Sequence, residues 1–401
     1  MKIIKKCQIC NFELTKILNL GKIPLVNDLV NKKKKSYPLI LNYCTKCTLG
    51  QINIHLDKSI LFPKTYPYTS STTNILKENF KNLSVEINKT FKLNKNKFLV
   101  DIGSNDGNLL SFFKNKCKIL GITPEDIGKT AIKKGIPTLL KYFDEGTVKE
   151  ILKKYSKADF VTATNVFAHI DGVHNVIKNI KLLLKKNGVF VSENHYFLSV
   201  IKEMQYDTIY HEHMRYYSLT SLDNLFKIYD LEIFHAKLIN SHGGSIRVYA
   251  AKKNLFKKTK SLKNLFIKEK KYLNIKFLKK FKHHVYAHKK NLINLINKYK
   301  LKNYIICGVG APSRASTLIN YCKITNKLVP FVFEIDGSSK IGKNVPGTQI
   351  KIVSEKSLKK INPDLLILFS WHISNYLIKR IKYNGYKGRF LIPLKTPKII
   401  R

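Results

Sequence analysis

The chain reads KFLVDIGSNDGNLL at residues 97–110, a short apolar run followed by a polar turn with two glycines. The run predicts a buried β-strand, and the residues after the turn predict the start of a helix. Gly103 and Gly107 let the backbone of the turn approach a ligand closely at the carboxyl end of a first parallel strand. The turn is not a GxGxxG fingerprint, and no Lys-Ser or Lys-Thr pair follows it. Neither a dinucleotide site nor a P-loop is therefore expected.

Three further apolar runs repeat the strand pattern downstream. They lie at residues 118–122, 158–164 and 189–194. Strands that alternate with helical patterns predict a doubly wound parallel sheet over residues 95–250. An amphipathic stretch from about Asn74 to Phe91 predicts a helix ahead of this sheet.

A second α/β unit is predicted at the C-terminal end. Residues 252–300 are rich in lysine and have helical apolar spacing, which predicts one or two helices that connect two domains. The apolar runs near residues 304–310, 332–336 and 365–369 then predict the strands of a second Rossmann-like sheet. The Gly308-x-Gly310 turn of this unit fits a tight turn as well as it fits a phosphate site.

Two CxxC pairs stand near the N-terminus, and their cysteines are Cys7, Cys10, Cys44 and Cys47. Four thiolates at this spacing suit a tetrahedral zinc ion and leave no position for water, so the predicted site is structural. The other three cysteines are isolated in the sequence and are predicted to be buried core residues.

The chain has 401 residues and a formal net charge of +47, but only six of its 73 basic residues are arginines. Base readout and bidentate phosphate contacts favour arginine, and the lysines are scattered along the whole length. No nucleic-acid partner is therefore expected, although the charge should attract an anionic substrate such as a nucleotide. No run of about 18 apolar residues is present, so no membrane helix is expected. The first residues lack an apolar signal segment, which predicts a cytoplasmic protein with reduced cysteines.

Groups that can transfer or orient a proton are concentrated in DTIYHEHMRYY, residues 207–217. Histidine titrates near neutral pH, so a catalytic base here needs little tuning. The segment could also be a polar surface loop, or a metal site. If it is extended, His211 and His213 share one face and Glu212 takes the other. A metal would then need a third ligand from elsewhere.

The turn at 101–107 resembles motif I of class I S-adenosylmethionine-dependent methyltransferases, which is an apolar strand, an acidic residue and a Gly-x-x-x-Gly turn. These enzymes usually carry an acidic residue at the end of the next strand, where it holds the ribose hydroxyls of the cofactor. Thr123 stands at that place here. Either Glu125 or Asp126 substitutes for it, or the ribose is held more weakly.

The whole chain resembles the sugar C-methyltransferases that act on nucleotide-linked 4-keto-deoxyhexoses. The motifs that carry this resemblance are the two cysteine pairs, LGKIPLVN at 20–27, DIGSNDG at 101–107, NVFAH at 165–169, TIYHEH at 208–213, HGGSIR at 242–247, GAP at 310–312 and KNVPGT at 343–348. Arg314 stands where the resemblance leads us to expect a lysine.

The resemblance implies an α/β protein of several parts. They are a zinc-binding module at residues 1–65, a doubly wound Rossmann-like methyltransferase domain at 66–251, a helical connector at 252–300 and a Rossmann-like α/β domain at 301–401. It also implies two cofactors, S-adenosylmethionine and a structural zinc ion.

Residue roles follow from the matched motifs. His213 is expected to be the general base, Tyr210 and Glu212 to orient the base and the substrate, and His169 and Tyr68 to complete the pocket. The residues expected to bind S-adenosylmethionine are Asp101, Gly103, Ser104, Asn105, Asp106, Gly107 and Asn165.

The function implied is methylation of a carbon of a nucleotide-linked 4-keto-deoxy sugar, by way of an enolate that a histidine base forms. Thymidine diphosphate is the carrier usual in that family, carbon 3 and carbon 5 both stay open, and a monomer is expected. The alternative is a zinc-containing class I RNA methyltransferase, although no Asn-Pro-Pro-Tyr-like motif is present. A nucleotide-sugar-binding scaffold without activity is disfavoured by the complete motifs.

Overall fold

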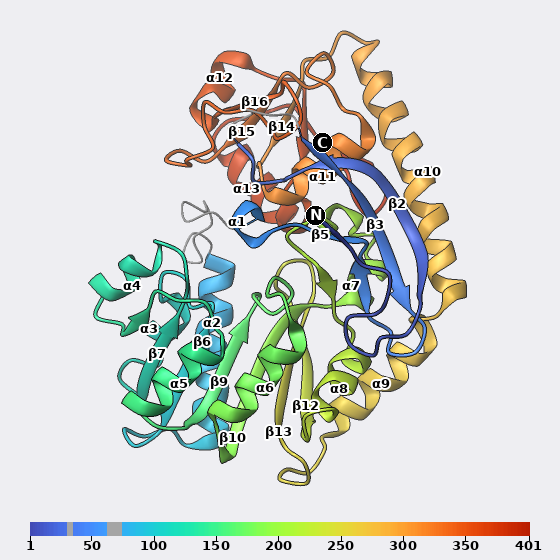
Figure 1. Cartoon of the computed structure of the whole chain (residues 1–401). Helices are drawn as coiled ribbons and strands as arrows, with labels where there is room; N and C mark the ends of the chain where they lie inside the picture. The colour runs from blue at the N-terminus through green and yellow to red at the C-terminus, as the bar shows by residue number, and fades with distance from the viewer. Residues whose placement is uncertain (30–34, 62–73) are drawn as a thin grey trace.

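The segment at 97–110 forms the first strand and turn of a seven-stranded sheet, as its sequence predicts (Figure 1). Strand β6 (Phe98–Ile102) runs into the glycine turn, and α3 (Asn108–Ser111) follows it. In this computed structural model, which describes residues 1–29, 35–61 and 74–401, the strand order is β12-β13-β10-β9-β6-β7-β8. Neighbouring strands are parallel, except that β13 is antiparallel to both β10 and β12. The doubly wound sheet is therefore confirmed, with one reversed strand that the apolar pattern does not reveal.

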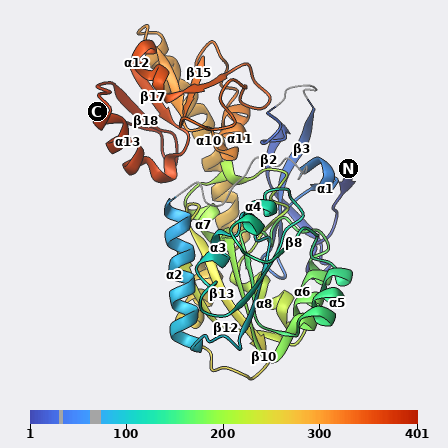
Figure 2. The same cartoon turned by 90° about the vertical axis from the view of Figure 1, so that its left-hand side faces the viewer.

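Helices cover both faces of this sheet, and Figure 2 shows α2 on one side with α5 and α6 on the other. Leu99 of β6 packs into the core under α2, whereas its neighbour Val100 packs into the core under α5 and α6. Because both faces of the sheet are buried, the sequences of its strands are continuous apolar runs. The bounds are α2 Asn74–Phe91, β7 Lys118–Ile122, α4 Gly128–Lys133, β8 Thr138–Leu139, α5 Glu145–Lys154, β9 Ala158–Thr164, α6 Val173–Leu183, β10 Leu184–His195, α7 Phe197–Lys202, α8 Leu219–Lys227, β12 Leu231–Ile239 and β13 Ser245–Lys252.

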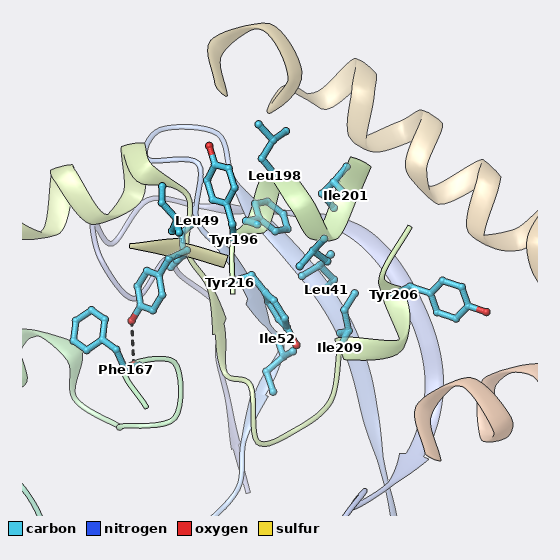
Figure 3. Packing of buried hydrophobic residues seen from close by; sticks show 14 of the residues in the cluster. Leu41, Leu49, Ile52, Phe167, Tyr196, Leu198, Ile201, Tyr206, Ile209 and Tyr216 are labelled. Carbon is cyan, nitrogen blue, oxygen red and sulfur yellow. Dashed lines mark hydrogen bonds between the residues drawn. The ribbon is translucent and has the colours of Figure 1, made fainter. Parts of the chain in front are cut away.

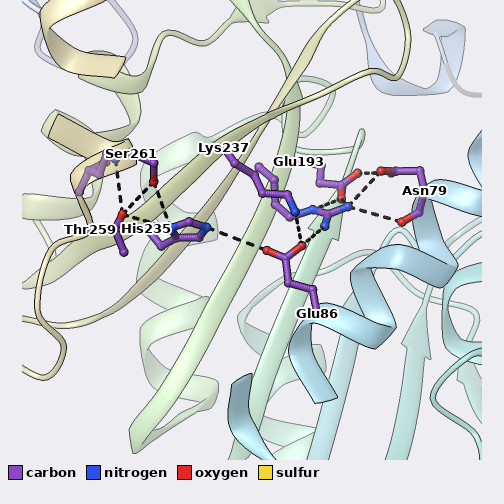
Figure 4. A network of polar contacts seen from close by, with 9 residues as sticks. Asn79, Glu86, Glu193, His235, Lys237, Thr259 and Ser261 are labelled. Carbon is purple, nitrogen blue, oxygen red and sulfur yellow. Dashed lines mark hydrogen bonds and ion pairs between the residues drawn. The ribbon is translucent and has the colours of Figure 1, made fainter. Parts of the chain in front are cut away.

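A buried ionic network fastens α2 to the sheet (Figure 4). The Arg247 guanidinium on β13 donates to the carboxylate of Glu193 on β10 at 2.6 Å, and to the carboxylate of Glu86 on α2 at 2.7 Å. It also donates to the Asn79 side chain at 3.0 Å. Lys237 reaches the same Glu86 carboxylate from the solvent side. A buried charge of this kind is tolerated because each partner is paired and hydrogen-bonded.

Replacing Arg247 by methionine should lower the free energy of unfolding by about 3–5 kcal/mol, because it leaves the Glu193 carboxylate buried without its partner. The matched control is Lys237→Met. Since the Lys237 side chain is 40% exposed, its ion pair should contribute no more than about 1 kcal/mol. Urea unfolding of the two variants, followed by circular dichroism, measures the difference. Equal losses in both would contradict a dominant role for the buried pair.

The N-terminal module is a small sheet that is completed by residues from the middle of the chain. Its own strands are β2 (Leu14–Pro24), β3 (Ser36–Cys44) and β4 (Gly50–Ile52), and β11 (Arg215–Tyr216) pairs antiparallel with β4. The residues 213–217 therefore lie against the module. Its short outer elements are β1 (Lys2–Ile3), β5 (Ile54–His55) and α1 (Lys58–Leu61).

One continuous apolar core joins the module to the large sheet (Figure 3). Leu41 and Ile52 of the module belong to the same cluster as Leu198 on α7, Ile209 and Tyr216, and all five side chains are buried. The module is therefore packed into the protein rather than tethered to it.

Two helices carry the chain to the C-terminal domain. They are α9 (Lys260–Tyr272) and α10 (Ile275–Lys300), and α10 runs alongside β2 to the far end of the molecule (Figure 1). Tyr43 of the module donates its hydroxyl to the Leu273 carbonyl between them at 2.8 Å. The helical connector that the lysine-rich stretch predicts is present as a pair of helices.

The C-terminal domain is a six-stranded sheet in the order β16-β15-β14-β17-β18-β19, parallel except for β19. It confirms the predicted second Rossmann-like unit. No helix in the described ranges is both long and apolar enough for a membrane span. The bounds are β14 Ile306–Val309, α11 Ser313–Cys322, β15 Phe331–Glu334, β16 Lys351–Ser354, α12 Leu358–Ile361, β17 Leu365–Leu368, η4 Trp371–Ile373, α13 Ser374–Tyr383, β18 Arg389–Ile392 and β19 Lys398–Ile400.

Candidate active site

The predicted proton-transfer residues lie on a tight turn between the short helix η2 (Tyr206–Thr208) and β11. We call residues 206–213 the catalytic turn, after the catalytic roles that the resemblance implies for Tyr210, Glu212 and His213. The His213 amide donates to the Tyr210 carbonyl at 3.0 Å, which closes a β-turn over 210–213. The segment is therefore not extended, and the expectation that His211 and His213 share one face is wrong. His211 instead points at the N-terminal module, where its Nε2 lies 3.3 Å from the Pro38 carbonyl oxygen.

Both ring nitrogens of His213 have a partner within the catalytic turn. Nδ1 lies 3.0 Å from the carbonyl oxygen of Thr208. A carbonyl oxygen only accepts, so Nδ1 carries the proton and donates. Nε2 is then the acceptor in the neutral ring, and the Tyr210 hydroxyl 3.0 Å away donates to it. The turn thus fixes the tautomer of His213 and leaves its basic lone pair on Nε2.

The surroundings keep His213 neutral. Burial lowers the pKa of His213 well below its usual value, and the nearby imidazoles of His169 and His195 lower it further. The hydrogen bond to Thr208 opposes this change but is the weaker effect. A neutral imidazole has an available lone pair, so His213 can accept a proton at physiological pH.

His169 lies beside His213, with the two rings tilted against each other. It lies in the loop that follows β9, and its ring centroid is 4.9 Å from that of His213. Its Nδ1 donates to the main-chain carbonyl of Glu212 at 2.6 Å. The structure therefore brings His169, Tyr210 and His213 together in one place, as the family resemblance implies.

Glu212 is expected to orient His213, but its carboxylate faces the N-terminal module. Its carboxylate accepts from the Asn27 side chain of the N-terminal module at 3.2 Å, whereas the His213 nitrogens bond to Thr208 and Tyr210. Burial raises the pKa of Glu212 to about 7. Its second oxygen is buried and has no hydrogen-bond partner in the part of the chain that the structure describes. Glu212 thus supports His169 through its main chain. The other pocket residue expected, Tyr68, lies outside the described residues.

The glycine turn at 103–107 is shaped to hold a ligand at the carboxyl edge of the sheet. Gly103 and Gly107 have φ angles of 73° and 76°, in the left-handed region that favours glycine. A Cβ at Gly103 would lie 2.6 Å from a methyl carbon of Val166. Ser104 Oγ is buried without a hydrogen-bond partner among the described residues, so a polar ligand can satisfy it. These features fit S-adenosylmethionine.

The acidic and amide residues of this region divide into two groups. Asp101 is buried at the end of β6, accepts from the Thr162 hydroxyl at 2.6 Å, and has a pKa that burial raises to about 7. Asp106 is also buried, with Lys134 3.5 Å from its carboxylate. By contrast, Asn105 and Asn165 are partly exposed, and both have left-handed backbones. The last two are the better placed to meet a ligand with their side chains.

Glu125 lies beside Thr123, which stands where the resemblance leads us to expect an acidic residue. Thr123 at the end of β7 donates its hydroxyl to the carboxylate of Glu125, which is half-buried. Asp126 is exposed and pairs with Lys129 at 2.7 Å. Of the two substitutes left open by the sequence, Glu125 is therefore the one held at the strand end.

Glu125→Gln should raise the dissociation constant of S-adenosylhomocysteine by about tenfold or more, because hydrogen bonds to a charged group contribute about 1.5–3 kcal/mol. The matched control is Asp126→Asn, which removes an exposed carboxylate and should leave the constant almost unchanged. Isothermal titration calorimetry measures both. An effect of Asp126→Asn as large as that of Glu125→Gln would contradict this assignment.

The four predicted zinc ligands converge in the N-terminal module. The ligand atoms of Cys7, Cys10, Cys44 and Cys47 all lie within 4.8 Å of one another. This donor set fits a closed tetrahedral zinc site. Within the described ranges, it is the only group of three or more potential ligands placed closely enough to share a metal ion. The alternative of a metal site at the histidines of the catalytic turn therefore finds no support.

Sequence reasoning missed three polar residues that surround the site. His195 ends β10, and its ring centroid lies 6.4 Å from that of His213. His242 stands in a turn with left-handed backbone, and burial lowers its pKa to about 4. Asn27 reaches Glu212 from the N-terminal module. The signal for His195 was its place at the carboxyl end of a parallel strand. His242 and Asn27 lay in quoted motifs without an assigned role.

Three family models match consecutive parts of the chain. Residues 7–62 match a zinc-binding domain, residues 75–236 a methyltransferase domain, and residues 240–395 a C-methyltransferase C-terminal domain. C-methyltransferase NovU from Streptomyces niveus is 26% identical over 411 residues, with 99% of this chain and 97% of the relative covered.

Solved structures resemble a little under half of the chain. A S-adenosylmethionine-dependent methyltransferase from Clostridium acetobutylicum covers 46% of this chain and 94% of its own length, with 13% identity and a TM-score of 0.36. Magnesium protoporphyrin IX methyltransferase from Synechocystis covers 45% of this chain and 85% of its own length, with 11% identity and a TM-score of 0.35.

Proposed function

We propose that this protein is an S-adenosylmethionine-dependent C-methyltransferase that methylates a carbon next to the ketone of a nucleotide-linked 4-keto-deoxy sugar. The matches to a zinc-binding domain, a methyltransferase domain and a C-methyltransferase C-terminal domain, and the similarity to a C-methyltransferase over nearly the whole chain, support this proposal. The observation that carries the proposal is the state of His213. Its Nδ1 donates to Thr208, and its Nε2 lone pair faces the Tyr210 hydroxyl. A neutral imidazole held in one tautomer beside a phenol is suited to removing a proton from carbon.

The reaction balances without any further reactant. The hydrogen on the carbon next to the ketone passes as a proton to Nε2 of His213, and its electron pair moves into the enolate. The enolate carbon then forms a bond to the methyl group while the bond from that methyl to sulfur breaks. The ketone is restored, S-adenosylhomocysteine leaves, and His213 passes its proton to water. S-adenosylmethionine supplies only the electrophilic methyl group.

Tyr210 acts on the developing charge, and His169 and Glu212 shape the surroundings of the base. Charge on the ketone oxygen needs a donor that is already in place. The Tyr210 hydroxyl can donate to that oxygen once the substrate replaces its hydrogen bond to His213. The His169 ring lies against the base and limits the water around it. Glu212 holds the ring of His169 through its carbonyl oxygen.

The loop from Asn165 to His169 connects the base to the methyl donor. Val166 packs against Gly103 of the cofactor turn, and His169 packs against His213. One short loop thus contacts both halves of the site, which supports a reaction between a carbon held near His213 and a methyl group held at the turn. The proposed cofactor contacts are the backbone of the turn, Ser104, Asn105 and Asn165, with Glu125 at the ribose.

The proposal extends to the partners. The net charge of +47 suits a diphosphate-linked substrate, and we propose thymidine diphosphate as the carrier and a monomer as the working form. A cytoplasmic location suits a four-thiolate site, which requires reduced cysteines. RNA methylation is not favoured, since the chain carries a C-methyltransferase C-terminal domain.

The test is mass spectrometry of purified protein incubated with S-adenosylmethionine and a panel of nucleotide-linked 4-keto-6-deoxyhexoses. We expect one sugar to gain one methylene, with no gain in the matched 4-hydroxy sugars, because only a ketone acidifies the neighbouring carbon. Methylation of a 4-hydroxy sugar, or of structured RNA in place of every sugar, would overturn the proposal.

A further inference from the structure

The C-terminal domain contacts the catalytic turn through helix α11. Helix α11 (Ser313–Cys322) packs against η2 and β2, and its first turn and a half carries three polar side chains that reach this region. Thr317 donates its hydroxyl to the Ile209 carbonyl at 3.4 Å. Ser313 donates to the Asn27 side chain at 2.8 Å, and Asn27 in turn donates to Glu212. The third side chain, Arg314, makes the most contacts.

Arg314 contacts residues of both domains, and its Nη2 donates to the Asp207 carboxylate at 3.3 Å. Its Nε lies 3.1 Å from the carboxylate of Asp207 in η2, and its Nη2 donates to the Gln205 side chain at 3.0 Å. Its Nη1 lies 3.0 Å from Nδ1 of His372, and its guanidinium carbon lies 4.8 Å from the ring centroid of Trp371. The indole nitrogen of Trp371 also donates to the Asp207 carboxylate at 2.8 Å. Trp371 of η4 and Arg314 of α11 thus contact the same carboxylate of the catalytic turn, and His372 contacts the guanidinium of Arg314.

This ion pair is removed from water. Arg314 is 6% exposed, and Asp207 is 0% exposed. Burial raises the pKa of Asp207, and the guanidinium of Arg314 and the indole of Trp371 oppose this. A buried pair of this kind adds little net stability over an apolar pair, but its fixed hydrogen bonds specify one geometry. Arginine suits that task because its planar fork makes several bonds at once, which the single ammonium of a lysine does not.

The ion pair lies next to the residue whose carbonyl oxygen orients the His213 ring. Asp207 directly precedes Thr208, whose carbonyl oxygen accepts from Nδ1 of His213. The same Thr208 carbonyl accepts from the Tyr216 hydroxyl at 3.1 Å. We propose that Arg314 is a positioning residue for catalysis, which through Asp207 holds the Thr208 carbonyl in place and thereby sets the orientation and tautomer of His213. The proposal rests on the proposed role of His213 as the base.

Through Arg314, the C-terminal domain contributes to the chemical step. Arg314 and Thr317 near the start of α11 contact Asp207 and Ile209 of the catalytic turn. These two residues flank Thr208 on both sides. A shift of about 1 Å in a catalytic group can lower a rate by about 100-fold. Arg314 occupies a place where the family resemblance leads us to expect lysine. Arg314→Lys therefore tests what the guanidinium group contributes in this chain.

The experiment compares Arg314→Lys with a matched control, Arg380→Lys. Arg380 pairs with Glu355 inside the C-terminal domain. Zinc content and binding of S-adenosylhomocysteine first establish that both variants are folded. We expect Arg314→Lys to lower kcat by about 10- to 100-fold, with a much smaller change in KM for the sugar nucleotide, and Arg380→Lys to change neither.

A second readout does not depend on the substrate. In protein labelled with ¹⁵N-histidine, the Nδ1–H tautomer of His213 has characteristic nitrogen shifts, which His213→Asn identifies by removing them. Arg314→Lys should convert this signal into a tautomer mixture, and Asp207→Asn should do the same if the lysine variant fails to fold. A wild-type signal in the folded variants would overturn the proposal, as would an unchanged kcat. If no sugar is methylated by the wild type, the proposed function fails, while the nitrogen shifts still decide the role of Arg314.

Discussion

Replacing His213 by asparagine is expected to lower the rate of C-methylation by a factor on the order of 10² to 10⁴, the usual contribution of a general base. Asparagine can still donate towards the Thr208 carbonyl, but its amide is not basic at physiological pH. The cofactor turn is at 103–107, on the other side of the loop that carries His169. Binding of S-adenosylhomocysteine should therefore be unchanged, and calorimetry beside a methyl-transfer assay separates the two effects.

The matched control is His283→Asn. His283 is exposed on α10, and this change should leave methyl transfer at the wild-type rate. Near-wild-type turnover by the His213 variant would exclude His213 as the base. A loss of cofactor binding equal to the loss of activity would mean that His213 supports the fold of the site instead.

Removing the zinc ion is expected to abolish methyl transfer, although its ligands are not expected to touch the substrate. Binding free energies of structural zinc in zinc-finger peptides are about 10–16 kcal/mol at neutral pH, so the module should unfold without it. The loss should reach the active site because β4 pairs with β11, and because the Ile52 amide donates to the Met214 carbonyl at 3.1 Å. Met214 directly follows the proposed base.

Cys44→Ser tests this expectation without a chelator. The variant should contain less than one zinc ion per chain and lack methyl transfer, whereas Cys307→Ser changes an equally buried cysteine of the C-terminal domain and should keep both. Elemental analysis and the methyl-transfer assay measure the pair. Full activity in a zinc-free protein would contradict a structural role of the module in the active site.

The local elements were predictable because their signals lie within one segment. The helix expected from about Asn74 to Phe91 has those bounds, and the strand expected at 118–122 is β7. In each case apolar residues at a fixed spacing meet a buried face. The three isolated cysteines are buried, as expected for small apolar side chains.

The arrangement of the site was less predictable, because it depends on contacts between distant segments. Alternation predicts faces only in an extended chain, and the β-turn at 210–213 places His211 and His213 apart. The pairing of β11 with β4 joins residues more than 160 positions apart, and two-residue strands have no pattern of their own. Arg314 and Asp207 likewise meet only once both domains are folded.

The most direct test of the proposed chemistry is hydrogen exchange at the sugar carbon in the absence of methyl transfer. Wild-type protein would be incubated in deuterated water with a 4-keto-6-deoxyhexose nucleotide and S-adenosylhomocysteine, and the sugar protons followed by nuclear magnetic resonance. We predict that one proton next to the ketone exchanges faster than it does without protein, and that His213→Asn removes this acceleration. Undiminished exchange with the variant, or no accelerated exchange with wild-type protein that methylates the same sugar, would contradict the account.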